Sequence, residues 1–145
     1  TAMLKAANMA GKAINITQTT AGHAMCYKLT SLYGISHGHA AALCVSKLFP
    51  YMLDNMDKCI DPRGEEHLLC ILERIADSMS CPNVKTACDK FDSILKDLEM
   101  KVPQADEKDY EVLKTSVNPI RLKNNPIELD DETIDNLYHE ILMDK

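Results

Sequence analysis

Two histidines, His23 and His37, lie fourteen residues apart and are the side chains in this sequence best suited to bind a divalent metal. We expect Gly34 to end the helix that carries His23, since glycine readily takes the left-handed conformation found there. We expect Gly38 to let the backbone turn tightly beside His37. Two imidazoles at adjoining helix ends can then point into one site. Imidazole is the commonest protein ligand for first-row metals, so the pair predicts a metal centre.

Two histidines do not complete a metal site, because a catalytic metal usually has at least three protein ligands. His39 is a candidate third ligand, although its spacing from His37 can equally aim it elsewhere. We therefore expect the remaining ligands to lie outside this chain. Tyr27 follows His23 by one helical turn, so its hydroxyl can reach the same cavity. A buried tyrosine with a hydrogen-bonded hydroxyl is an equally good interpretation of Tyr27.

The composition is that of an ordinary globular protein, and it excludes several functions. At 145 residues, of which 46% are hydrophobic, the chain fits one domain over residues 1–145 with a substantial core. A net charge of −6 without a dense Lys/Arg cluster excludes tight nucleic-acid binding. No apolar run approaches the length of about 20 residues that spans a bilayer, so we expect no membrane partner.

Six cysteines raise the question of disulfides, but most lie on the apolar faces of predicted helices and none forms a Cys-x-x-Cys pair. Free cysteine packs like a small hydrophobic residue. We therefore interpret the cysteines as buried free thiols in a reducing compartment, and we expect a cytoplasmic protein. The beginning of the chain also lacks the basic segment and apolar core of a secretory signal.

Apolar residues recur at helical spacing nearly throughout, and no segment alternates convincingly like a β-strand. The sequence therefore predicts an all-α bundle of about six to seven helices. Residues 118–125, with Pro126 directly after them, are predicted to form a loop. We expect the helices to span residues 3–14, 19–33, 37–55, 62–79, 81–98 and 105–116, with a closing helix from residue 130 onward.

The first predicted helix has no start signal, so we expect it to be the remainder of a helix that enters from an upstream segment. No Gly-x-Gly-x-x-Gly or Gly-x-x-x-x-Gly-Lys segment occurs that could hold nucleotide phosphates. No Gly-x-Ser-x-Gly nucleophile elbow occurs either. The sequence therefore indicates the metal-site part of a larger enzyme.

The residues around the two histidines resemble the C-terminal helical domain of the iron-containing alcohol dehydrogenase family. His23-Ala24-Met25 is similar to the family's His-Ala-Met-x-His segment. The run Tyr33-Gly34-Ile35-Ser36-His37-Gly38 is similar to its Tyr-x-x-Pro-His-Gly segment. The separation of the two histidines also agrees, and the similarity extends over nearly the whole chain.

The resemblance implies a dehydroquinate synthase-like C-terminal helical fold in which His23 and His37 are two ligands of Fe²⁺ or Zn²⁺. The other two ligands, an aspartate and a histidine four residues later, would lie upstream of this chain. The resemblance also implies a missing N-terminal nucleotide-binding domain that holds NAD(P)H, and a small alcohol or aldehyde as substrate. The metal would act as a Lewis acid on the substrate oxygen, with Tyr27 orienting or protonating nearby. This chain alone would then be inactive. Whether it forms a homo-oligomer is not decided by the resemblance.

Two departures from the family pattern concern residues beside the histidines. Tyr27 stands where the family often has a second histidine, and Ser36 replaces the common proline before His37. Within the family, the stretches 12–51 and 117–126 resemble most closely the phosphonoacetaldehyde reductase branch. An anionic phosphonate would suit Arg121 or Lys123, although cations in surface loops usually have no such specific role.

Two alternatives remain open from the sequence. The chain can be a non-catalytic helical interaction domain in which the histidines are incidental. It can also hold a complete metal site of its own, with His39 or a cysteine as a further ligand.

Overall fold

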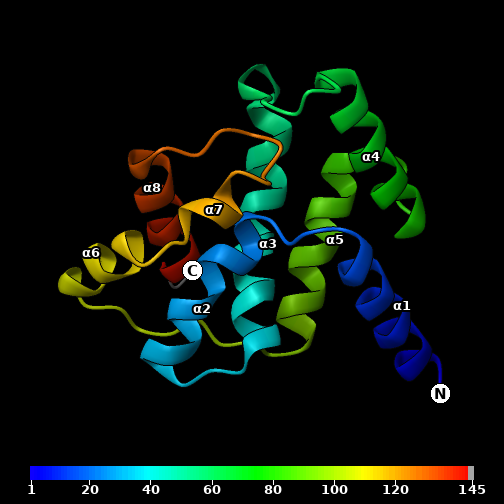
Figure 1. The fold of residues 1–145 in the computed structure, drawn as a ribbon. Helices are drawn as coiled ribbons and strands as arrows, with labels where there is room; N and C mark the ends of the chain where they lie inside the picture. The colour runs from blue at the N-terminus through cyan, green and yellow to red at the C-terminus, as the bar shows by residue number, and fades with distance from the viewer. Residues whose placement is uncertain (144–145) are drawn as a thin grey trace.

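The computed structural model describes residues 1–143, and these fold into eight α-helices and one short 3₁₀ helix (Figure 1). The only pairing of extended backbone within these residues is an isolated bridge between Cys59 and Ile127. The all-α prediction is confirmed. The helices are α1 (Ala2–Ile16), α2 (Ala21–Tyr33), α3 (His37–Asp54), η1 (Met56–Lys58), α4 (Glu65–Ser78), α5 (Val84–Asp97), α6 (Glu107–Thr115), α7 (Pro119–Leu122) and α8 (Asp131–Leu142).

The helix α7 lies where the sequence predicted a loop, so this part of the prediction is wrong. The side chain of Asn118 accepts hydrogen bonds from the N–H groups of Ile120 and Arg121, at 2.9 and 3.4 Å. Pro119 takes the first helical position, where its missing N–H costs nothing. An asparagine cap followed by proline is therefore enough to form one helical turn inside an otherwise irregular connection.

The start of α4 also differs from the prediction, which placed Pro62 at its first position. The carboxylate of Asp61 accepts hydrogen bonds from the backbone N–H and the guanidinium of Arg63. These bonds close a turn that ends at Gly64, whose φ of +87° lies in the region that favours glycine. The helix begins only afterwards, at Glu65.

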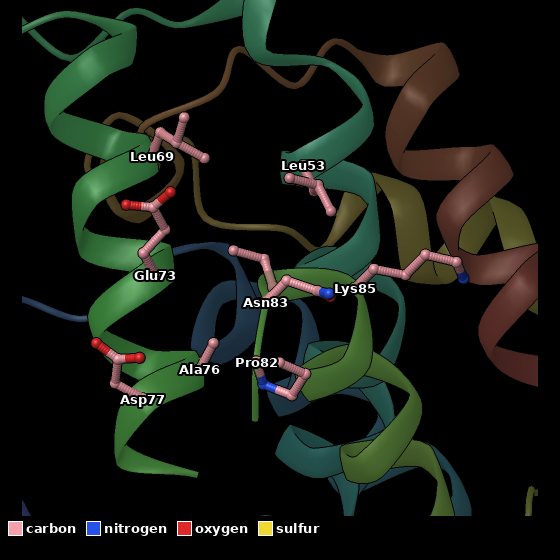
Figure 2. Close-up of a pocket in the computed structure, with 9 residues that line it drawn as sticks. Leu53, Leu69, Glu73, Ala76, Asp77, Pro82, Asn83 and Lys85 are labelled. Atoms are coloured by element: carbon pink, nitrogen blue, oxygen red, sulfur yellow. The ribbon is translucent and has the colours of Figure 1, made fainter. Parts of the chain in front are cut away.

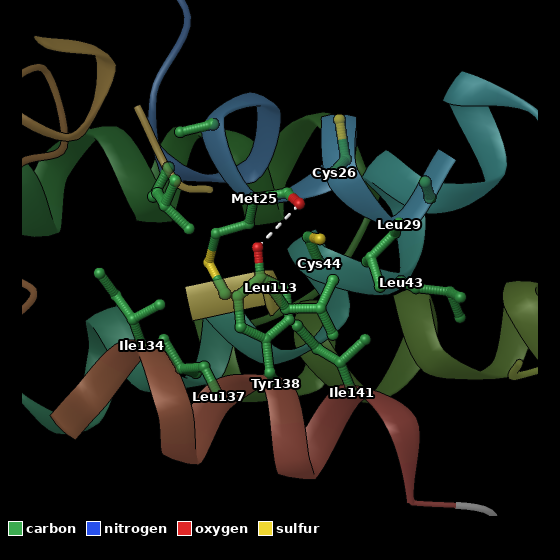
Figure 3. Packing of buried hydrophobic residues seen from close by; sticks show 14 of the residues in the cluster. Met25, Cys26, Leu29, Leu43, Cys44, Leu113, Ile134, Leu137, Tyr138 and Ile141 are labelled. Carbon is green, nitrogen blue, oxygen red and sulfur yellow. Dashed lines mark hydrogen bonds between the residues drawn. The ribbon is translucent and has the colours of Figure 1, made fainter. Parts of the chain in front are cut away.

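The main hydrophobic cluster joins α2, α3, α6 and α8 (Figure 3). Tyr138 of α8 lies at its centre with its side chain fully buried, and its hydroxyl donates a hydrogen bond of 2.9 Å to the carbonyl oxygen of Met25 in α2. The other labelled members of the cluster in Figure 3 are Cys26, Leu29, Leu43, Cys44, Leu113, Ile134, Leu137 and Ile141. Helix α8 thus packs against α2 through this cluster and is joined to it by the hydrogen bond of Tyr138.

A second cluster joins the C-terminal half of α3 to α4 and α5, and Ile127 from the connection before α8 completes it. Leu68, Leu72 and Ala76 are its buried residues from α4. Ile75 of the same helix is 41% exposed. Tyr51 of α3 packs against both clusters, so α3 is the helix that links them.

The helix α1 contributes to neither cluster. None of its residues is buried, and its apolar residues Met3, Leu4 and Ile14 are between 52% and 79% exposed. Figure 1 shows α1 extending to one side of the other helices, with the N-terminus at its outer end. Its apolar residues therefore lie outside both hydrophobic clusters of the described residues.

All six cysteines are free thiols in the structure. Cys26, Cys44 and Cys81 are buried, whereas Cys70 is exposed. The interpretation as buried thiols therefore holds for half of the set. No helix among the described residues combines the length and the apolar character needed to cross a membrane.

We expect Tyr138→Phe to lower the free energy of unfolding of the chain by about 1 kcal/mol, because one buried hydrogen bond is lost while the ring remains in place. The measurement is the midpoint of urea unfolding. Tyr110→Phe is the matched control, since the Tyr110 hydroxyl makes no hydrogen bond to the described residues. Equal effects of the two changes would show that the bond between α8 and α2 adds no stability.

Candidate metal centre

His23 lies on α2 and His37 on α3, and a short connection fixes where the first helix ends and the second begins. Gly34 ends α2 with a φ of +67°, and its N–H donates a 3.0 Å hydrogen bond to the carbonyl oxygen of Thr30. Ser36 then caps α3 and accepts a hydrogen bond from the N–H of His39. The prediction that Gly34 ends α2 is confirmed. Ser36, which replaces the family's proline, thus has a capping role that proline cannot perform.

The structure brings His23, His37 and Tyr27 together. The ring centroids of His23 and His37 lie 5.2 Å apart, with their planes tilted by 56°. The rings of Tyr27 and His37 are also 5.2 Å apart. His23 is half-buried, while His37 and Tyr27 are exposed. The three side chains therefore form an open face, on which further groups can approach the two imidazoles.

The position of His23 depends on close packing of the residue before it. A Cβ atom on the buried Gly22 would lie 3.1 Å from Cγ2 of Val45 in α3, so only glycine fits here without displacement. The expectation for Gly38 is wrong, because this residue is in the first turn of α3 and a Cβ on it would meet nothing within 4 Å. The glycine that matters for the geometry of the site is thus the one next to His23.

A cysteine completes the inner side of this face. The sulfur of Cys26 lies 3.7 Å from Nδ1 of His37 and donates to the carbonyl oxygen of His23. Burial raises the pKa of the Cys26 thiol, so it stays protonated at neutral pH. A protonated thiol is a poor nucleophile and a poor metal ligand. Cys26 therefore packs against His37 rather than acting by itself.

Arg121 of α7 is the residue of this face that the sequence did not connect with the histidines. Its Nη1 donates a 2.5 Å hydrogen bond to the hydroxyl oxygen of Tyr27, and its guanidinium carbon lies 4.7 Å from the centre of the Tyr27 ring. Helical spacing relates only residues within one helix, so it cannot predict a contact between Tyr27 and Arg121, which are 94 positions apart. The one available signal was the presence of Arg121 in the stretch that resembles the phosphonoacetaldehyde reductase branch.

The surroundings keep His23 neutral. Its pKa is lowered from the ordinary value, first by burial and then by the neighbouring charges of His37 and Arg121. Metal ions bind the neutral form of imidazole. Two close and tilted imidazoles, one of them held neutral, are a suitable pair of nitrogen donors for Fe²⁺ or Zn²⁺.

The structure does not bring His39 into this pair. Its Nε2 lies 2.8 Å from the carbonyl oxygen of Lys101, a contact that directs the ring toward the connection between α5 and α6. Within residues 1–143, no three side chains of His, Cys, Asp or Glu come together in a way that could hold a metal ion. The described residues thus supply two donors of the kind that a metal centre needs.

A groove between α4 and α5 is another hollow that could hold a ligand (Figure 2). Its volume is about 430 Å³, and its lining includes Glu73 and Asp77 from α4 and Lys85 from α5. Neither His23 nor His37 contributes to it. The residues with metal-binding chemistry therefore lie on the face formed by α2, α3 and α7.

Comparison with known proteins identifies a matching family model and a similar curated protein. The family model described as "Fe-containing alcohol dehydrogenase family, C-terminal" matches residues 1–142. A phosphonoacetaldehyde reductase from Streptomyces viridochromogenes is 29% identical over 141 residues, which are 96% of this chain and 35% of the relative. The chain thus spans about a third of the length of this relative.

A solved structure has the same fold. The sulfoacetaldehyde reductase from Bifidobacterium kashiwanohense, in complex with NAD+, matches with a TM-score of 0.67 and 23% sequence identity. The match covers 86% of this chain and 31% of the reductase. At this identity the likeness establishes the helical fold alone.

We expect Gly22→Ala to be less stable than Gly38→Ala by about 1–3 kcal/mol, because the added methyl group overpacks the contact between α2 and α3 only at Gly22. Both residues lie in first helical turns, so the gain from replacing a helical glycine largely cancels in the comparison. The free energy of unfolding from urea titration measures the difference. Equal stability of the two variants would contradict the close approach of α2 to α3 at Gly22.

Proposed function

The chain belongs to the iron-containing alcohol dehydrogenase family, and from this premise we propose that it is the metal-binding C-terminal domain of an NAD(P)-linked reductase of small aldehydes. The observation that carries the proposal is the approach of the His23 and His37 rings to 5.2 Å on one open face. The two similar proteins named above are both reductases of aldehydes. The reverse reaction would oxidise the corresponding alcohol.

In this proposal, His23 and His37 hold Fe²⁺ or Zn²⁺ through their ring nitrogens. Further ligands come from a part of the enzyme outside these 145 residues, as does the domain that binds NAD(P)H. The short share of the relatives that this chain covers, 35% and 31%, supports this division. We leave His39 out of the ligand set, because its ring already contacts the Lys101 carbonyl.

A metal held by His23 and His37 would supply Lewis-acid polarisation of the aldehyde oxygen, and a nicotinamide would supply the hydride. Tyr27 is the group of this chain that serves the substrate oxygen directly. Its hydroxyl accepts a hydrogen bond from Arg121, which leaves its own O–H to donate. Tyr27 therefore orients the aldehyde and provides a proton to the oxygen as the alcohol forms. This is the position at which the family often has a histidine.

The proposal implies that the isolated chain does not catalyse the reaction. Two imidazoles alone bind a metal weakly, and the sequence contains no Gly-rich phosphate loop for a nucleotide. The domain would contribute ligands and the Tyr27 hydroxyl only once it is joined to the rest of the enzyme.

We expect His37→Ala in the full-length enzyme to reduce the bound metal to well below one ion per chain and to lower kcat/KM by about 100-fold or more, since a ligand of the Lewis acid is lost. Elemental analysis measures the metal, and oxidation of NAD(P)H with a small aldehyde measures the activity. His39→Gln is the matched control and should change neither quantity.

The outcomes separate the proposal from its alternatives. Undiminished metal in His37→Ala would contradict the assignment. A full-length protein without metal or reductase activity would favour a helical interaction domain. Equal losses in the His37 and His39 variants, with tight metal binding by the isolated chain, would favour a complete site within these residues.

A further inference from the structure

The guanidinium of Arg121 is held in a fixed position beside the histidine pair. It lies over the ring of Tyr27 at 4.7 Å and donates to the hydroxyl oxygen of the same residue at 2.5 Å. A cation above an aromatic face is attracted by the ring's negative charge distribution. Two interactions with one residue thus restrain a half-buried side chain that would otherwise sample many rotamers.

The positive charge of Arg121 has no counter-charge in the described part of the chain. Arg63 illustrates the usual arrangement, with its guanidinium bonded to the carboxylate of Asp61 at 2.9 and 2.7 Å. No carboxylate among residues 1–143 forms an ion pair with Arg121. One N–H is used by Tyr27, and the remaining N–H groups have no protein partner within these residues.

Arg121 lies close to the histidine pair, because the ring of Tyr27 contacts both sides. Its centre is 5.2 Å from that of the His37 ring and 4.7 Å from the Arg121 guanidinium carbon. A ligand with a carbonyl oxygen at the histidine pair and a negative group a few bonds away would place that negative group at the guanidinium.

We propose that Arg121 determines substrate specificity by binding the anionic end of a short aldehyde that carries a tetrahedral oxyanion, a phosphonate or a sulfonate. This inference rests on the proposed reductase function and names the class of its substrate. The planar guanidinium offers parallel N–H groups to two oxygens of such an anion. Tyr27 then has two roles: its hydroxyl serves the aldehyde oxygen, and its ring positions the arginine.

The experiment compares anionic with neutral substrates in the full-length enzyme. It measures kcat and KM for phosphonoacetaldehyde, sulfoacetaldehyde and the neutral propanal. Arg121→Gln should lower the preference for the anionic aldehydes over propanal by about 10- to 100-fold, mainly through KM, as expected for the loss of a charge-assisted hydrogen bond. Arg121→Lys should restore part of the preference, because it restores the charge without the planar group.

Lys123→Gln is the matched control, since it removes a positive charge two residues further on. Lys123 is exposed and lines a different hollow, together with Asp61 and Arg63. The control should leave the preference unchanged. The ratio between the two anionic aldehydes in the wild type identifies phosphonate or sulfonate as the better ligand. Equal losses of Arg121→Gln on anionic and neutral aldehydes, or an unchanged preference, would overturn the inference.

A binding measurement separates this inference from the proposed function. Methylphosphonate titrated into the 145-residue chain should shift the NMR signals of the Tyr27 and His37 rings, and Arg121→Gln should abolish the shifts. Their absence in the wild-type chain would count against an anion site. If the shifts occur while the full-length protein reduces no aldehyde, the anion site stands and the reductase function fails.

Discussion

The packing of α2 against α3 is the constraint on which the candidate site depends. A Cβ atom on Gly22 would crowd the Val45 side chain at 3.1 Å, so the close packing of α2 against α3 at this point depends on glycine. The left-handed turn at Gly34 and the cap at Ser36 then fix where α3 begins. With these three contacts in place, the first turn of each helix presents its histidine to the same face, and no flexible loop is involved.

The rest of the molecule supports this pair of helices from the other side. The cluster around Tyr138 packs α6 and α8 against α2 and α3, and α3 continues into the second cluster with α4 and α5. Among residues 1–143, the single turn of α7 is the further element that contributes a side chain, Arg121, to the face that carries the histidines. A rigid core on one side and an open polar face on the other are what a domain needs if it is to complete a site together with another part of its enzyme.

The sequence predicts the elements with long periodic patterns and the residues related by helical spacing. The helical class, the end of α2 at Gly34 and the placement of Tyr27 beside His23 all follow from local rules. The errors arise where two local rules compete. At Pro62 an Asp–Arg turn displaces the helix start, and at Asn118 a cap and a proline make a helical turn inside an apparent loop.

The role of Gly22 was missed because it depends on Val45 in another helix. The contact of Arg121 with Tyr27 was missed for the same reason, since only the tertiary fold brings them together.

The hydrogen bond from Tyr138 to the carbonyl of Met25 joins residues that are 113 positions apart, and Met25 lies between His23 and Tyr27 in α2. When the segment that carries both histidines leaves the ribosome, α8 has therefore not yet been synthesised. Helix α2 gains this buried contact only after the intervening helices and α8 have been made.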